Sequence, residues 1–188
     1  EIEKKKDNTP LTKADKAAHK IISSILQESK IPVLSEEGKS IPYETRKYWN
    51  KLWIVDPIDG TKEFIKRNGE FTVNIALIEK NKPVIGVILT PASGILYFSE
   101  KNIGAFKSTT NLDYFNPENL LAESLPLPLN HENKAYTVVA SRSHLSKETK
   151  AYLENLKAKH GELKLISKGS SLKLCMMAEG RANCYPRF

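Results

Sequence analysis

Two aspartates, Asp56 and Asp59, stand three residues apart around a proline within residues 53–65. They directly follow an apolar run that is typical of a buried strand, so both carboxylates would lie at a strand end, where α/β proteins place active sites. Two carboxylates 4 Å apart would repel by roughly 4 kcal/mol at an effective dielectric near 20. A hard divalent cation is the simplest partner for such a pair. Asp-Pro and Asp-Gly are also ordinary turn dipeptides, and the pair alone leaves that alternative open.

Gly60 and Thr61 extend this motif toward phosphate chemistry. A glycine followed by Thr and by residues 62–65 is typical of a tight turn that opens into a helix. The free N–H groups and the positive dipole end at such a turn suit a phosphate. Magnesium ligands beside an anion site predict phosphoryl transfer.

Two upstream segments carry further oxygen ligands and a candidate base. Glu36 follows the strand-like residues 33–35 and could be the third carboxylate of a two-metal site, although a solvated charge pair with Glu37 is the alternative. Thr12 and Asp15 fit a capping box for the helix that follows them. Capping alone would explain both residues. The functional interpretation is that Asp15 accepts, through Thr61, a proton from an attacking water.

These three blocks, in this order, resemble the magnesium-dependent, lithium-sensitive phosphatases of the inositol monophosphatase superfamily. The Asp-Pro-Ile-Asp-Gly-Thr run of residues 56–61, preceded by Glu-Glu, carries the resemblance, and residues 62–65 are similar to the 3'(2'),5'-bisphosphate nucleotidase branch. The resemblance implies two or three Mg²⁺ ions, with Thr61 and Asp15 activating the nucleophilic water. The implied metal ligands are Glu36, Asp56, the backbone carbonyl of Ile58, and Asp59. The implied contacts to the scissile phosphate come from Glu36, Asp59, Gly60 and Thr61.

The second half of the chain supplies the implied nucleotide contacts. Residues 141–144 follow a strand-like segment, and residues 169–173 open a helix at an apparent strand end, where Gly and Ser bind phosphates readily. Local alternatives are a surface histidine, a helix cap and two solvated charges. The residues that the resemblance places around the nucleoside monophosphate are His144, Ser170, Lys173 and Arg187.

Both ends of the sequence differ from the family pattern. The family continues with a Gly-Pro turn and a Trp-Asp-x-Ala segment whose aspartate is another metal ligand, whereas this sequence stops at Phe188. The first helix of the family would precede Glu1. We therefore expect an incomplete ligand set and a sequence that is part of a longer protein.

The hydrophobic pattern predicts an α/β protein in two parts, and the resemblance implies a layered α-β-α-β-α sandwich. We expect a metal-binding α+β domain over residues 1–107, a linker excursion over 108–134 and a partial α/β domain over 135–188 that contributes nucleotide contacts. Helices are expected at 13–29, from 61, at 146–159 and at 170–179. Strands are expected at 51–56, 71–79, 84–90, 95–99, 105–107, 136–141 and 163–167, with 71–79 and 84–90 forming a hairpin.

Composition is that of an ordinary globular protein, with 40% hydrophobic and 27% charged residues. The net charge of +7 permits a nucleic-acid partner, but the lysines are scattered and no RNA-binding or zinc-finger signature accompanies them. Cys175 and Cys184 lack the spacing of a metal or redox motif, so we expect free thiols. No transmembrane span or signal peptide is visible. We expect a cytoplasmic location. Peripheral association at the inner face of the membrane and the oligomeric state are both left open.

The predicted function is hydrolysis of the 3'-phosphate of adenosine 3',5'-bisphosphate to AMP, as in sulfur assimilation. A small-molecule nucleotide is therefore the expected partner. An inositol monophosphatase or another sugar-phosphate phosphatase could use the same site. From other classes, the alternatives are a catalytically silent nucleotide-binding regulator, against which the intact pair of Asp15 and Thr61 argues, and a basic nucleic-acid-binding domain.

Overall fold

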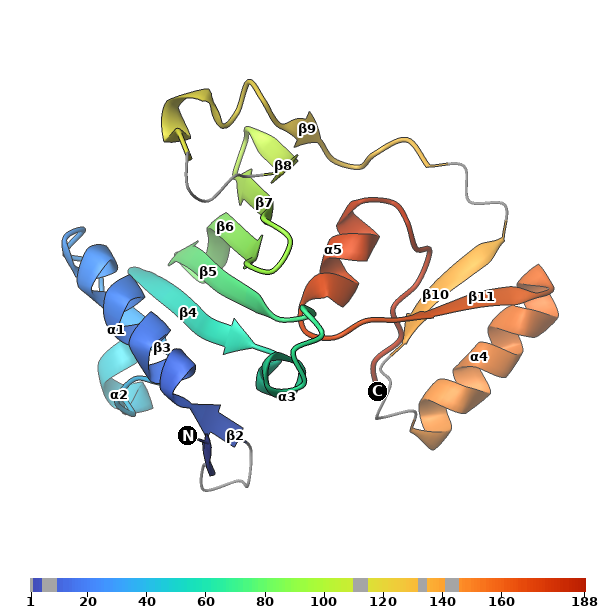
Figure 1. Cartoon of the computed structure of the whole chain (residues 1–188), viewed down its shortest axis with the longest axis horizontal. Helices are drawn as coiled ribbons and strands as arrows, with labels where there is room; N and C mark the ends of the chain where they lie inside the picture. Colours follow the sequence, from blue (N-terminus) through green and yellow to red (C-terminus); the bar gives the residue numbers. More distant parts are fainter. Residues whose placement is uncertain (1, 5–9, 110–114, 132–134, 141–145) are drawn as a thin grey trace.

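A mixed sheet forms the centre of the computed structural model, which describes residues 2–4, 10–109, 115–131, 135–140 and 146–188 (Figure 1). Its strand order is β3-β4-β5-β6-β7-β8-β9, and only β3 and β4 run parallel. The α/β class predicted from the sequence is confirmed. The strands of this sheet are β3 (Val33–Ser35), β4 (Lys51–Asp59), β5 (Thr72–Glu79), β6 (Lys82–Thr90), β7 (Ile95–Glu100), β8 (Gly104–Thr109) and β9 (Leu125–Pro126).

Strand β4 runs past the boundary that the sequence predicted. We expected it to end at residue 56, but it continues to Asp59 through a register shift, with Asp56 opposite Asn74 and Asp59 opposite Thr72. Pro57 lacks an N–H group and cannot continue the ladder, so the strand bulges at this point. A bulge bends the strand and redirects its side chains, and such bulges often lie next to active sites.

The N-terminal elements lie along β3 and β4 and reach the segment that follows the end of β4. Strands β1 (Ile2–Lys4) and β2 (Pro10–Thr12), which the sequence did not predict, form an antiparallel pair. Helix α1 (Lys13–Gln27) follows and packs on β3 and β4, and the short helix α2 (Tyr43–Arg46) lies between those two strands in the chain (Figure 1). The capping box predicted at the start of α1 is present.

The predicted hairpin is formed by β5 and β6, with a tighter turn than expected. The turn residues Lys80 and Asn81 both have positive φ, at 49° and 61°, so β6 begins at residue 82 rather than 84. Such a turn matches the right-handed twist of the flanking strands.

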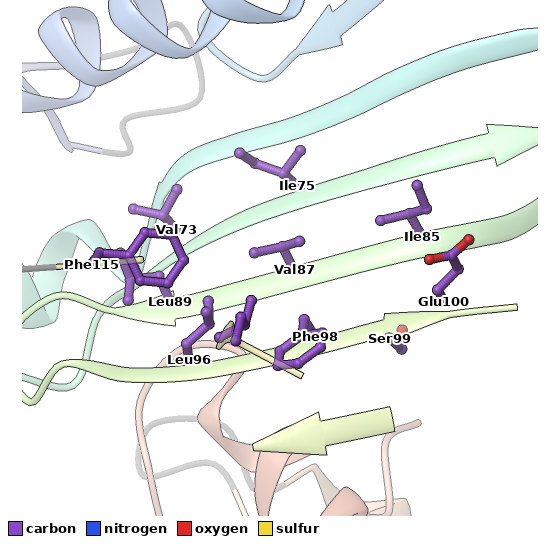
Figure 2. A pocket seen from close by; sticks show the side chains of 11 residues that line it. Val73, Ile75, Ile85, Val87, Leu89, Leu96, Phe98, Ser99, Glu100 and Phe115 are labelled. Carbon is purple, nitrogen blue, oxygen red and sulfur yellow. The ribbon is translucent and has the colours of Figure 1, made fainter. Parts of the chain in front are cut away.

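One face of this hairpin borders an apolar hollow. Figure 2 shows Val73, Ile75 and Val87 turned toward it, with Phe115 at one end. The hollow also contacts β7 through Leu96 and Phe98. It contains none of the candidate site residues, so we do not assign the chemistry to it.

The C-terminal part adds a βαβ unit and a helix that packs against the main sheet. Strands β10 (Tyr136–Ala140) and β11 (Leu163–Ser167) are parallel, and helix α4 (Lys147–His160) connects them. Helix α5 (Leu172–Ala178) packs on β10, and together with Ile88 and Tyr97 of the main sheet it lines a second cavity (Figure 1). It starts two residues later than expected, after Ser170, whose φ is 47°.

Described parts of the expected linker over residues 108–134 carry secondary structure. Strand β8 continues to Thr109, a 3₁₀ turn covers Pro117–Asn119, and β9 pairs with β8, with Pro126 opposite Phe106. The edge strand β9 therefore joins this segment to the first sheet. The division into two domains stays a prediction.

A buried carboxylate anchors the end of α5. Glu179 is 1% exposed, and it accepts hydrogen bonds from Tyr97 Oη at 2.8 Å and from Lys107 Nζ, while Arg181 Nη1 lies 3.5 Å from it. Burial alone would raise the pKa of Glu179, but the hydrogen bonds from Lys107 and Tyr97 and the nearby positive charges outweigh it and lower that pKa. Burial and the adjacent Glu179 raise the pKa of Cys175 to about 12, so its buried thiol stays protonated.

Both cysteines are free, as predicted. Among the helices in the described parts of the chain, none has the length and apolar character needed to cross a membrane.

Candidate active site

The bulge of β4 brings the three predicted carboxylates together. The backbone N–H of Glu36 donates to the carbonyl of Val55 at 3.0 Å, which extends the β3–β4 pairing and sets Glu36 beside Asp56. Burial, the negative charges of Glu36 and Asp59, and a hydrogen bond with Glu36 raise the pKa of Asp56 to about 7. The backbone at Ile58 opposes this shift. An acid whose pKa is raised by two neighbouring acids marks a site that a cation would relieve.

The donor atoms at this bulge match a hard cation. Carboxylate and carbonyl oxygens are the ligands that Mg²⁺ prefers, and the acids are accompanied by the buried Ile58, whose carbonyl accepts a hydrogen bond from Thr61 Oγ1 at 3.3 Å. Within the described residues, however, no group of three or more His, Cys, Asp or Glu side chains is already arranged as a metal-coordinating set. The acids are thus near one another without forming a closed shell.

Asp15 serves two neighbours at once. Its Oδ2 accepts hydrogen bonds from the N–H of Thr12 at 2.8 Å and from the Thr12 hydroxyl. Its Oδ1 accepts from Thr61 Oγ1 at 3.3 Å. The two interpretations of Asp15, as a helix cap and as the partner of Thr61, are therefore compatible, because each uses a different oxygen of a carboxylate that is 1% exposed.

The turn after the acids requires glycine for two reasons. Gly60 has φ 90°, in the left-handed region that side chains disfavour. A Cβ at this position would also lie 3.1 Å from Ser170 Cβ and 3.2 Å from the carbonyl of Glu70. Helix α3 (Thr61–Ile65), which follows, has only five residues, so any attraction for phosphate depends on the N–H groups of the turn more than on a helix dipole.

The same contact places Ser170 at the candidate site. Ser170 comes from the connection between β11 and α5, more than a hundred residues after Gly60. Its hydroxyl accepts the N–H of Leu172 at 3.4 Å, but the N-cap position of α5 is Ser171, so Ser170 is not the cap residue of the local alternative. Its close approach to Gly60 is a property that the tertiary structure provides.

The other predicted nucleotide residues have different surroundings. Lys173 is not the solvated charge of the local alternative, because its Nζ donates to the carbonyls of Ser170 at 2.7 Å and Lys168 at 3.2 Å. Arg187 is exposed and donates from Nη1 to Tyr185 Oη at 3.1 Å. His144 lies outside the described residues.

Sequence reasoning missed the polar residues that hold this connection against the main sheet. Ser171 Oγ donates to Asn74 Oδ1 at 2.9 Å and lies 2.8 Å from Thr72 Oγ1, and Glu70 accepts the N–H of Gly169 at 2.9 Å. The only signal in the sequence was the presence of Thr72 and Asn74 in an otherwise apolar strand.

Known proteins resemble this chain over its whole length. A model of the inositol monophosphatase family matches residues 1–188. The 3'(2'),5'-bisphosphate nucleotidase CysQ of Salmonella typhimurium is 45% identical over 190 residues, which cover 100% of this chain and 70% of the relative.

Solved structures give the same relationship. The crystal structure of CysQ from Bacteroides thetaiotaomicron, a bacterial member of the inositol monophosphatase family, superposes with a TM-score of 0.87 at 50% identity, covering 98% of this chain and 69% of that one. The extragenic suppressor protein suhB from Bartonella henselae, at 24% identity, has the same fold with a TM-score of 0.73 over 100% of this chain and 69% of its own.

Proposed function

The chain belongs to the inositol monophosphatase family, and we propose that it is a metal-dependent 3'(2'),5'-bisphosphate nucleotidase. The substrate would be adenosine 3',5'-bisphosphate, whose 3'-phosphate is hydrolysed to leave AMP, or its sulfated precursor. The observation that carries the proposal is the contact between Thr61 and Asp15 directly beside the three acids of the β4 bulge. The match to CysQ nucleotidases across the whole chain supports the substrate class.

The cation that this donor set fits is Mg²⁺, with two or three ions in the complete site. Its proposed ligands are Glu36, Asp56, Asp59 and the carbonyl of Ile58. When bound, it supplies positive charge and Lewis acidity to the phosphoryl oxygens. The raised pKa of Asp56 supports this assignment, because a cation would relieve the repulsion among these carboxylates.

Thr61 and Asp15 are the proposed proton acceptors for the attacking water. Thr61 Oγ1 takes a proton from the water as its own proton passes to Asp15 Oδ1, and the water oxygen bonds to phosphorus. The bond between phosphorus and the 3'-oxygen then breaks, and that oxygen takes a proton from solvent. The two hydrogen bonds from Thr12 hold Asp15 in place for this transfer.

The nucleotide would lie between the Asp59–Gly60–Thr61 turn and the connection that carries Ser170. The close approach of Ser170 to Gly60 supports this placement, and Lys173 brings a positive charge to the same connection. His144 and Arg187 are the other proposed contacts. The proposed location is the cytoplasm, with a nucleotide and not a nucleic acid as the partner.

A phosphate-release assay tests the proposal. The protein is assayed with Mg²⁺ on adenosine 3',5'-bisphosphate and, in parallel, on inositol 1-phosphate. We expect a higher kcat/KM for the nucleotide. A higher value for inositol 1-phosphate would favour an inositol monophosphatase on the same acids, and inactivity on both substrates would contradict the assignment as a phosphatase.

A further inference from the structure

The connection between β11 and α5, residues 168–171, lies against the segment that follows the acid motif. A Cβ added to Gly169 would stand 2.8 Å from Glu63 Cγ and 2.8 Å from the carbonyl of Glu70, so the two backbones are too close for any side chain at this glycine. Ser170 stands next in the chain, near Gly60. We call residues 168–171 the nucleotide loop.

Glu70 binds this loop through both oxygens of its carboxylate. Oε2 accepts the N–H of Gly169 at 2.9 Å, and Oε1 accepts from Lys168 Nζ at 3.1 Å. The side chain of Glu70 is 13% exposed and that of Lys168 is 43% exposed, so the carboxylate is shielded from water more than its partner ammonium is. Hydrogen bonds to an ionised acceptor in such surroundings are stronger and shorter than neutral ones.

The opposite side of the loop is also held. Lys173 donates to the carbonyls of Lys168 and Ser170, and Ser170 itself adopts a φ of 47°, an uncommon value for a residue other than glycine. A residue keeps such a conformation only where its surroundings impose it. The loop is thus fixed between a carboxylate on the main sheet side and an ammonium on α5.

The water-activating pair is separate from these contacts. Thr61 bonds to Asp15 and to the carbonyl of Ile58, and Asp15 bonds to Thr12, whereas the bonds of Glu70 described above end on the nucleotide loop. Removal of the Glu70 carboxylate takes away two bonds to the nucleotide loop and none of these bonds of Thr61 and Asp15.

From this geometry we propose that Glu70 is a positioning residue that sets the place of Ser170 over the Gly60 turn and thereby the binding of the part of the nucleotide that does not react. The inference rests on the proposed function. Glu70 does not touch the reacting atoms; it acts through the backbone of Gly169.

The experiment compares Glu70→Ala, Glu70→Gln and a matched control in the full-length protein. The control is Glu79→Ala, because Glu79 forms an ion pair of the same 3.1 Å length with Lys51 at the far end of β5. For each protein, kcat and KM are measured for adenosine 3',5'-bisphosphate, and amide hydrogen exchange is followed in peptides that cover residues 163–175 and in peptides that cover β4 and α3.

We expect Glu70→Ala to raise KM for the nucleotide by on the order of tenfold, with kcat within about threefold of the wild type. Exchange should accelerate over the nucleotide loop and stay unchanged over β4 and α3. Glu70→Gln keeps an acceptor for Gly169 and should restore most of the wild-type KM. Glu79→Ala should match the wild type in all three measurements.

Unchanged KM and unchanged loop exchange in Glu70→Ala would overturn the proposal. So would a fall in kcat with KM unchanged, because that pattern places Glu70 in the chemical step. If Glu70→Ala does not fold, the variant Lys168→Met provides the test, because it removes the ion pair with Glu70 and keeps the bond from Gly169. Faster exchange in the nucleotide loop together with a KM raised by about threefold would support the proposal. Wild-type exchange and wild-type KM would contradict it. A wild-type protein inactive on the nucleotide would instead contradict the proposed function, while the exchange data would still show whether Glu70 holds the loop.

Discussion

Asp56 at the β4 bulge and Glu179 at the end of α5 are both carboxylates withdrawn from water, and their pKa values move in opposite directions. Burial and the charges of Glu36 and Asp59 raise the pKa of Asp56 to about 7. Around Glu179, hydrogen bonds and positive charges from Lys107, Tyr97 and Arg181 outweigh burial, and the pKa falls. The protein thus supplies the partners of one acid and gathers further acids around the other.

The difference separates a structural carboxylate, Glu179, from a proposed metal ligand, Asp56. A buried acid with its own cation needs nothing from outside and ties α5 to the sheet. A cluster of acids that raise one another's pKa is unfavourable in the free protein, and it is relieved when a cation arrives. The comparison therefore predicts that changes at the bulge will alter turnover, and that changes at Glu179 will alter stability.

The largest expected effect is at the bulge itself. Asp59→Asn removes a negative charge and keeps the turn chemistry, so turnover should fall by on the order of 10³-fold at saturating Mg²⁺. Thermal stability of the metal-free protein should stay the same or rise, because repulsion with Asp56 is reduced. Steady-state kinetics and a melting curve measure both. Retention of more than about a tenth of wild-type kcat would count against Asp59 as a ligand.

The opposite pattern is expected at the structural acid. Glu179→Ala leaves Lys107 without its buried partner and should lower the free energy of unfolding by about 3 kcal/mol. Urea unfolding measures the change, and kcat at a temperature where the variant is folded should remain near the wild-type value. A loss of kcat larger than the loss of folded protein would show that the comparison between the two acids is wrong.

A smaller effect on turnover is expected at Asp15, which is both a capping residue of α1 and the proposed proton acceptor. Asp15→Asn should lower kcat by on the order of 10²-fold with little change in KM, because the amide cannot take the proton from Thr61.

Thr12→Ala is the matched variant for the cap. It should cost about 1 kcal/mol of stability and leave most of the turnover. Equal kinetic losses in Asp15→Asn and Thr12→Ala would mean that Asp15 acts only through the helix cap.

The smallest expected effect is the pH dependence of stability in the metal-free protein. The folded pKa of Asp56 is about 7 against an ordinary value of 3.8, so the folded state binds the extra proton, and this residue makes stability fall as pH rises between those values. Glu179 has a lowered pKa, so its contribution is present above its ordinary pKa of 4.5 and is lost as pH falls below it.

Urea unfolding in the presence of a chelator, measured between pH 4.5 and 7.5, tests whether the free energy of unfolding falls as pH rises. Asp56→Asn should flatten the decline, by on the order of 1 kcal/mol over the range, and saturating Mg²⁺ should do the same in the wild type. A metal-free wild type whose stability rises steadily over this range would contradict the shift proposed for Asp56.

Much of the candidate site could be predicted from local patterns. Asp56, Asp59, Gly60 and Thr61 lie within six residues of one another, and the capping box joins residues only three apart, so spacing marked them as candidates, while the family resemblance supplied their individual roles. Strands with alternating or continuous apolar residues were located to within a few positions for the same reason. The exceptions, such as the extension of β4 to Asp59, depend on pairing with a neighbouring strand.

Only the tertiary structure decided which residues of the first half of the chain contact residues of the second half. The approach of Ser170 to Gly60, the bonds from Glu70 to the nucleotide loop, and the bonds from Tyr97 and Lys107 to Glu179 join residues about 70 to 110 positions apart. A polar residue has the same local pattern whether its partner is water or a distant backbone N–H, so the sequence could mark Glu70 and Glu179 only as charges. Their roles arise when folding removes water from these acids, because a buried carboxylate must then find its hydrogen bonds and compensating charge within the protein.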